Sequence, residues 1–194
     1  MLKNVNRQIL KALGWTIAGE ELKNHRRCVA LAAPHTSNWD FYYTLSAFRE
    51  LGLPMRFTIK DDWMKFPYGL VMKPLGGIAI DRSPRKEGEE RPSMVEAMVR
   101  LFENPAFELA LVVTPEGTRS HSPQWKSGFY HVATQAKVPI LLCYLDYAKK
   151  EAGVGKVLYP SGNFESDMRE IMEFYQHITP KHPERFTIDA RYLR

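Results

Sequence analysis

The segment that most constrains the fold of this chain runs from Val29 to Phe41 and reads VALAAPHTSNWDF. Residues 29–33 are small or β-branched and carry no charge, which is typical of a strand buried on both faces. Pro34 ends this run. The apolar periodicity from Trp39 to Leu51 then predicts a helix that ends at Gly52. The sequence therefore predicts a strand, a polar corner and a helix start.

The polar corner contains His35 and Asp40. Five steps along a regular helix turn a side chain by about 500°, so two helical residues at this spacing would point apart. If His35 lies at the strand's exit and Asp40 in the first helical turn, the carboxylate can fold back onto one imidazole nitrogen. The other nitrogen is then free to accept a proton. This pattern favours a general base with an orienting acid; the alternative is that Asp40 only caps the helix.

Further segments continue the alternation of strand and helix. Strands are expected at residues 55–60, 76–81, 108–114 and 138–147, and helices at 92–104, 127–137 and 165–178. This order predicts an α/β fold with a mixed, largely parallel sheet flanked by helices, and with its site at the carboxyl ends of the strands. The chain has 194 residues and no repeat or linker-like stretch, so we expect a single domain, residues 1–194.

Two of these strands end in corners that carry charge. Asp81 and Arg82 follow one strand, and Glu116, Gly117 and Arg119 follow another. Guanidinium groups bind phosphate oxygens in a bidentate manner, and a glycine exposes backbone, so Arg82 and Arg119 are candidates for holding a phosphate. The alternative is that each corner is a solvated ion pair, because such pairs are common on protein surfaces.

Two segments have the character of membrane-facing surfaces. Residues 1–14 contain an amphipathic helix with Lys3, Arg7 and Lys11 on its polar side. It could lie in a membrane interface or pack on its own domain. The stretch from Trp63 to Met72 is the richest in apolar and aromatic residues, and Pro67 should bend or split any helix there. That stretch could line an acyl-chain groove, face a membrane or belong to the core.

Charge narrows the class of partner, and cysteine content indicates the compartment. The formal net charge of +5 favours an anionic partner such as a phosphate ester, an acidic lipid surface or nucleic acid. Cys28 and Cys143 lie in apolar runs, so we expect buried free thiols and a reducing compartment. No apolar run approaches the roughly 20 residues that span a bilayer, and no signal peptide is evident.

Four blocks in order, PHTSNWD, GGIAIDR, PEGTRS and VPI, resemble those of the lysophosphatidate (glycerolipid) acyltransferase family. They cover residues 29–142, and the pairing of the first block with PEGTRS is the most specific part. The resemblance implies transfer of a fatty acyl group from acyl-CoA or acyl-carrier protein to the hydroxyl of a lysophospholipid or glycerophosphate. It implies His35 as the base and Asp40 as its orienter. The residues it links to binding the phosphorylated acceptor are Arg82, Glu116, Gly117, Thr118 and Arg119.

This reaction needs no metal and no cofactor, since the thioester donor is a co-substrate. The fourth block lacks a second proline, so the acceptor stays open and could be an amino-lipid or another alcohol. A non-enzymatic, basic membrane-binding module remains an alternative, whereas nucleic acid is not expected as a partner. Metal-hydrolase, serine-hydrolase and nucleotide-binding motifs are missing from the sequence. We expect a cytoplasmic protein that associates peripherally with the inner face of the membrane.

Overall fold

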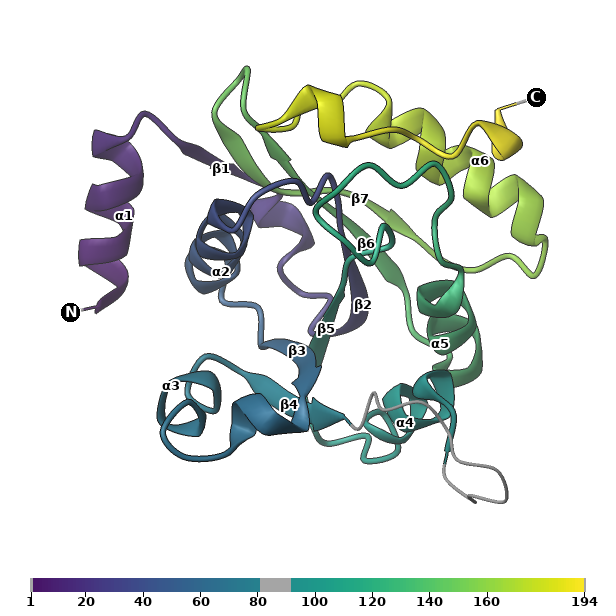
Figure 1. Ribbon diagram of the computed structural model, residues 1–194, viewed down its shortest axis with the longest axis horizontal. Coiled ribbons are helices and arrows are strands. Elements are labelled where there is room, and N and C mark those ends of the chain that lie inside the picture. The colour runs from purple at the N-terminus through teal and green to yellow at the C-terminus, as the bar shows by residue number, and fades with distance from the viewer. Residues whose placement is uncertain (1, 81–91, 194) are drawn as a thin grey trace.

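The computed structural model describes residues 2–80 and 92–193 and is built on one central sheet (Figure 1). In this part of the chain the sheet has seven strands, in the order β1-β7-β6-β2-β5-β3-β4. The strands are β1 (Thr16–Ala18), β2 (Arg27–Ala32), β3 (Met55–Lys60), β4 (Gly77–Ile80), β5 (Leu109–Val113), β6 (Ile140–Asp146) and β7 (Glu151–Leu158). The α-helices are α1 (Leu2–Ala12), α2 (Trp39–Leu51), α3 (Gly69–Met72), α4 (Met94–Arg100), α5 (Gly128–Ala136) and α6 (Phe164–Tyr175). Short 3-10 helices are η1 (Glu20–Leu22), η2 (Asp61–Met64), η3 (Pro183–Arg185) and η4 (Ala190–Tyr192).

The sheet is mixed but mostly parallel, which confirms the predicted fold class. Strand β2 pairs in parallel with both β5 and β6, and β3 pairs in parallel with β5 and β4. Only β7 and β1 run the other way, because β7 is antiparallel to β6 and β1 is parallel to β7. The carboxyl ends of five neighbouring strands therefore lie along one edge of the sheet.

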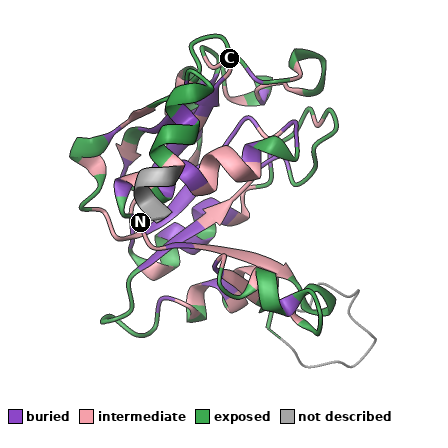
Figure 2. Cartoon of the chain, turned by 90° about the vertical axis from the view of Figure 1, so that its left-hand side faces the viewer, coloured by how far each residue is buried: buried purple, intermediate pink, exposed green. Residues whose placement is uncertain are grey.

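Strand β2 is the centre of the core, as its composition predicted. Residues 28–31 have no exposed surface. Successive side chains of a strand point to opposite faces. Accordingly Val29 and Leu31 pack in a cluster with residues of α4, α5 and α6, whereas Cys28 and Ala30 pack with Phe48 of α2. Helices thus cover both faces, and Figure 2 shows the buried strands between the exposed outer sides of the helices. Cys28 is also a buried free thiol, as predicted.

Helix α1 packs against α2 of its own chain. Leu10 is 2% exposed and clusters with Ala47. The side-chain amide of Asn6 donates to the carbonyl of Ser46 at 3.3 Å, and the Ser46 hydroxyl donates to Asn6 Oδ1 at 2.9 Å. The Leu10 side of α1 therefore packs on the rest of the chain, which is one of the two alternatives expected from the sequence. None of the helices described here has both the length and the apolar character needed to cross a bilayer.

Strands β1 and β7 were not predicted. Strand β7 contains Gly153 and Gly155, and glycine lowers the strand propensity of a segment. Gly153 pairs with Ala18 of β1, and a Cβ at position 153 would lie 2.1 Å from the Ala18 carbonyl oxygen. A Cβ at position 155 would lie 2.5 Å from the Phe174 ring. The glycines therefore admit close neighbours on a strand, which is a known use of glycine in sheets.

Candidate active site

The two most specific sequence motifs meet at one edge of the sheet. Strands β2 and β5 are adjacent and parallel, with Leu31 opposite Val113. The loops that follow both strands therefore leave from the same edge. His35 lies three residues beyond the end of β2, and Glu116 lies three residues beyond the end of β5. The backbone N–H of His35 donates to Glu116 Oε1 at 2.9 Å, which joins the two loops directly.

His35 and Asp40 face each other across the predicted bend. The distance from His35 Nδ1 to Asp40 Oδ2 is 3.6 Å, which suits an ion pair and is longer than a hydrogen bond. The Asp40 side chain is 2% exposed and that of His35 is 19% exposed. With Nδ1 turned toward the carboxylate, Nε2 is the nitrogen left to take a proton from a substrate. If Nε2 accepted a proton, the ring would become an imidazolium, and the negative charge of Asp40 would stabilise it.

Asp40 is held by more than His35. Its Oδ2 accepts hydrogen bonds from the backbone N–H groups of Thr36 and Ser37, both at 2.8 Å. Its Oδ1 accepts a hydrogen bond from the Tyr147 hydroxyl at 2.7 Å. Burial alone would raise the pKa of Asp40, but the interactions with His35, Tyr147 and the two N–H groups outweigh it and lower this pKa. Asp40 is therefore an anion at neutral pH, and it fixes the loop that carries His35.

The capping alternative describes only part of the role of this carboxylate, because Asp40 is an acidic residue in the first turn of α2 and also contacts His35. The residue at the helix N-cap is Asn38, whose side chain makes no capping bond. Asp40 lies inside the first turn, and its Oδ2 accepts hydrogen bonds from the N–H groups of Thr36 and Ser37, which precede the helix. The carboxylate thus stabilises the corner as a whole, including the His35 contact.

Glu116 is a buried acid. It is 5% exposed, and its Oε2 has no hydrogen-bond partner among residues 2–80 and 92–193. Burial raises the pKa of Glu116 to about 7, an effect that the hydrogen bonds from its own N–H and from that of His35 only partly offset. At neutral pH this side chain therefore exists in both protonation states. The protonated form would present an O–H donor beside His35.

The raised pKa of Glu116 predicts a pH-dependent cost to folding. Its ordinary value is 4.5 and its folded value about 7, so between these pH values the folded chain keeps a proton that the unfolded chain releases. The free energy of unfolding should fall across this window as pH rises, by at most roughly 3 kcal/mol. We expect Glu116→Gln to abolish that slope. Urea unfolding between pH 4.5 and 8, with the exposed Glu165→Gln as control, measures it; equal slopes in Glu116→Gln and wild type would contradict the assignment.

Gly117 makes room for a lysine that the sequence analysis did not identify. Its φ is +65°, and a Cβ there would lie 2.6 Å from Lys126 Nζ. The Lys126 backbone N–H also donates to the Pro115 carbonyl at 2.9 Å. Lys126, nine residues beyond Gly117, therefore brings a positive charge to the PEGTRS corner. Its contact with Gly117 is through space, so no motif marked it.

The remaining predicted binding residues are placed differently. Thr118 and Arg119 lie on the same loop and are exposed, and the Thr118 hydroxyl accepts a hydrogen bond from the Ser120 N–H at 3.1 Å. Arg82, with Asp81, lies outside the described residues. The structure thus joins His35, Asp40 and Glu116 through direct contacts, and it places Arg119 on the adjoining surface.

A C-terminal segment also reaches this corner, and no motif in the sequence indicated this contact. The His182 N–H donates to the Thr36 hydroxyl at 3.3 Å. The Lys181 ammonium lies 5.4 Å from the centre of the Trp39 ring and 6.0 Å from that of Tyr147, within the range of cation–π contacts. Lys181 is therefore a second cation beside the site. It lies at position 181, far along the chain from His35.

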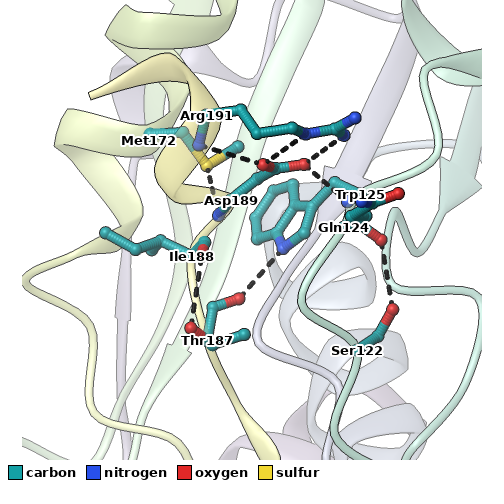
Figure 3. Close-up of polar contacts among 8 residues, drawn as sticks. All are labelled: Ser122, Gln124, Trp125, Met172, Thr187, Ile188, Asp189 and Arg191. Carbon is teal, nitrogen blue, oxygen red and sulfur yellow. Dashed lines mark hydrogen bonds and ion pairs between the residues drawn. The ribbon is translucent and has the colours of Figure 1, made fainter. Parts of the chain in front are cut away.

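The same C-terminal segment fastens the loop that carries Glu116 (Figure 3). Asp189 is fully buried, and its Oδ2 accepts a hydrogen bond from the Trp125 N–H at 2.9 Å. The Arg191 guanidinium donates to both carboxylate oxygens, at 2.8 and 2.6 Å. The Trp125 indole N–H donates to the Thr187 carbonyl at 3.1 Å. These bonds tie the end of the Pro115–Trp125 loop to the last turn of the chain.

A small cavity adjoins the His35–Asp40 pair. It lies between β2, α2, β6 and β7, and most of its lining is apolar, including Phe48, Cys143 and Leu145. Across residues 2–80 and 92–193, no three His, Cys, Asp or Glu side chains are grouped so that they could hold a metal ion. His35 and Glu116 supply acid–base groups at this edge, beside cations and an apolar surface.

Known proteins resemble this chain in sequence pattern and in fold. A family model described as Acyltransferase matches residues 15–146, more than half of the chain. The fold is similar to the crystal structure of the 1-acyl-sn-glycerophosphate (LPA) acyltransferase PlsC from Thermotoga maritima, with a TM-score of 0.58 and 16% sequence identity. That match covers 90% of this chain and 75% of the other. No curated protein matches the sequence.

Proposed function

Because this chain belongs to the acyltransferase family, we propose that it moves a fatty acyl group from the thioester of acyl-CoA or acyl-carrier protein to a hydroxyl of a lysophospholipid or glycerophosphate. The family model and the fold confirm the resemblance to the glycerolipid acyltransferases that the four sequence blocks indicated. The observation that best supports the proposed reaction is the meeting of His35, Asp40 and Glu116 at one edge of the sheet.

In the proposed reaction His35 is the general base. Its Nε2 takes the proton of the acceptor hydroxyl while the oxygen attacks the thioester carbon. The imidazolium so formed is stabilised by Asp40, whose pKa is lowered. The tetrahedral intermediate then collapses, the C–S bond breaks, and the sulfur takes the proton from the imidazolium. A thiol with a pKa near ~8.5 is a good leaving group, so this second step needs no stronger acid.

The anionic part of the acceptor has cations available at the same edge. Arg119 is exposed on the loop after β5, and Lys126 lies over Gly117. Lys181 stands on the other side of the corner, over Trp39. These groups support binding of a phosphate, and Arg82 remains a sequence-based prediction for the same role. The apolar cavity beside His35 is suited to contact with hydrocarbon rather than with the phosphate.

Removing Arg119 should weaken acceptor binding more than it slows chemistry. We expect Arg119→Ala to raise KM for a phosphorylated acceptor about tenfold to a hundredfold, since a hydrogen bond to a charged group contributes roughly 1.5–3 kcal/mol. The value of kcat should change little. Arg49→Ala is the matched control, because Arg49 is exposed in the last turn of α2, at the other end of that helix. Equal KM values in Arg119→Ala and Arg49→Ala would contradict the assignment.

The test of the proposed function is a direct product assay. Purified protein is incubated with labelled acyl-CoA or acyl-carrier protein and, in turn, with lysophospholipids, glycerol 3-phosphate, amino-lipids and simple alcohols. An acylated phosphate-containing lipid supports the proposal and identifies the acceptor. If a product formed only from an amino-lipid or a simple alcohol, that compound would be the acceptor in place of the phosphorylated one. The absence of any product from either donor would favour the non-enzymatic alternative.

A lysophospholipid acceptor and its acylated product both reside in bilayers, so we also propose that the protein works at the cytoplasmic face of a membrane, as a peripheral protein. The net charge of +5 supports attraction to anionic lipid surfaces. Part of α1 is available for such contact, because Ile9 and Leu13 are 42% and 45% exposed.

A further inference from the structure

The connection between β3 and β4 exposes apolar side chains that nothing in the described chain covers. Five large apolar residues lie within nine positions, and we call them the apolar tip: Trp63 (47% exposed), Phe66 (85%), Tyr68 (56%), Leu70 (69%) and Val71 (56%). Single exposed apolar residues are ordinary, but a contiguous group of large ones usually marks a surface of interaction. Figure 1 shows α3, which carries Leu70 and Val71, apart from helices α4 to α6.

The apolar tip belongs to a well-packed segment. Gly69 is buried, and a Cβ there would lie 2.2 Å from the Met64 carbonyl oxygen. The Met64 sulfur in turn lies 3.3 Å from where a Cβ of Gly77 would be, so the inner side of the segment is fitted to β4. On the outer side, the rings of Trp63 and Tyr68 lie 5.1 Å apart. The apolar side chains therefore point outward from a folded support.

The segment starts at the edge of the sheet that holds the candidate site. Strand β3 pairs with β5 so that Phe57 is opposite Val112. Strand β5 ends one residue beyond Val112, at Val113, and β3 ends three residues beyond Phe57, at Lys60, so both strands end at the same edge of the sheet. Neighbouring strands are about 4.8 Å apart, so the ends of β2 and β3, with β5 between them, are roughly 10 Å apart. The apolar tip therefore begins close to the His35 edge.

The charges and residue types around the apolar tip suit a lipid surface. Lys60, Lys65 and Lys73 flank the apolar side chains, against two acids, Asp61 and Asp62. The ion pairs that Lys60 and Lys65 form with these acids are exposed, so they give way easily to other anions. Trp and Tyr prefer the interface between water and hydrocarbon, and lysines there contact anionic headgroups. A protein partner would need a matching apolar face; a bilayer needs none.

We propose that the apolar tip docks the protein onto anionic bilayers, with the side chains of Phe66 and Leu70 entering the lipid interface. The inference rests on the proposed function in one respect: docking at this edge brings a bilayer lipid close to His35. Binding itself requires no catalysis, so the two proposals can fail separately.

The experiment compares the full chain with the double variant Phe66→Ser/Leu70→Ser by vesicle co-sedimentation. The vesicles are phosphatidylcholine alone or phosphatidylcholine with phosphatidylglycerol. Wild type should bind the anionic vesicles, and the double variant should bind at least about tenfold more weakly, because two large apolar side chains no longer leave water. Tyr159→Ser is the matched control, since Tyr159 is 66% exposed and follows β7 at the opposite edge of the sheet. It should bind like wild type.

Further measurements distinguish the possible failures. Acyl transfer from a short-chain acyl-CoA to glycerol 3-phosphate, both soluble in water, should be unchanged in the double variant, which shows that it is folded. Equal vesicle binding by the double variant and wild type would overturn the docking proposal whatever the activity. A second outcome would also overturn it. If wild type formed a dimer, the double variant were monomeric and both bound vesicles equally, the apolar tip would bind a second copy of the chain instead of a bilayer. If wild type transfers no acyl group, the proposed function fails and the binding result stands alone.

Discussion

Replacing His35 by alanine is expected to lower kcat for acyl transfer by about 10²- to 10⁴-fold, the usual contribution of a general base. The imidazole Nε2 is the group available to take the acceptor's proton, since Nδ1 faces Asp40 at 3.6 Å. The fold should survive, because the His35 side chain is 19% exposed and its link to Glu116 is made by the backbone N–H. Rates measured at saturating thioester and acceptor test this, with circular dichroism and thermal unfolding as checks of folding.

His131→Ala is the matched control for His35→Ala, because His131 is an exposed histidine of α5. It should leave kcat unchanged. If His35→Ala kept more than about a tenth of the wild-type rate while remaining folded, His35 would not be the base. A loss of kcat with an unchanged KM would favour a role in the chemical step over a role in binding.

Asp40→Asn is expected to lower kcat by about 10²- to 10⁴-fold as well, for a different reason. The neutral amide no longer attracts the imidazolium, and it can turn its NH2 group toward His35 Nδ1 and so favour the wrong tautomer. The same change removes a charged acceptor from the N–H groups of Thr36 and Ser37, so unfolding free energy should fall by about 1–3 kcal/mol. Because the folded pKa of Asp40 is lowered, its stabilising effect is present above about pH 4 and lost as pH falls further.

Tyr147→Phe provides the graded comparison for Asp40→Asn. It removes only the hydroxyl that donates to Asp40 Oδ1 at 2.7 Å and leaves the carboxylate in place. We expect a loss of kcat well below that of Asp40→Asn, and a higher pKa for Asp40. Steady-state rates and urea unfolding over pH 3–8 measure both effects. A variant Asp40→Asn with normal kcat would show that His35 needs no orienting acid.

The local part of the site could be predicted because it is encoded in short segments. A charge-free strand, a proline and a helix start place His35 and Asp40 on either side of a bend, and five parallel strands bring the loop of Glu116 to the same edge. What the sequence analysis did not identify comes from distant contacts. Tyr147, Lys181 and Lys126 reach the site through tertiary packing, and no spacing in the sequence indicates which polar residue will meet which partner.

Strand β7 was not predicted because it contains glycines at positions where neighbouring atoms leave no room for a side chain. In β7, Gly153 and Gly155 lower the apparent strand propensity, yet they are needed because Ala18 and Phe174 come so close. The acid–base behaviour of Glu116 was also beyond the sequence, since a pKa of about 7 follows from burial that only the fold defines.

The bond between Asp189 and Trp125 joins residues 64 positions apart, and it ties the far end of the Glu116 loop to the C-terminal segment. The His182 contact with Thr36 ties the His35 corner to the same segment. One stretch of chain therefore holds both corners of the candidate site, so a change confined to residues 182–191 would disturb the two corners together.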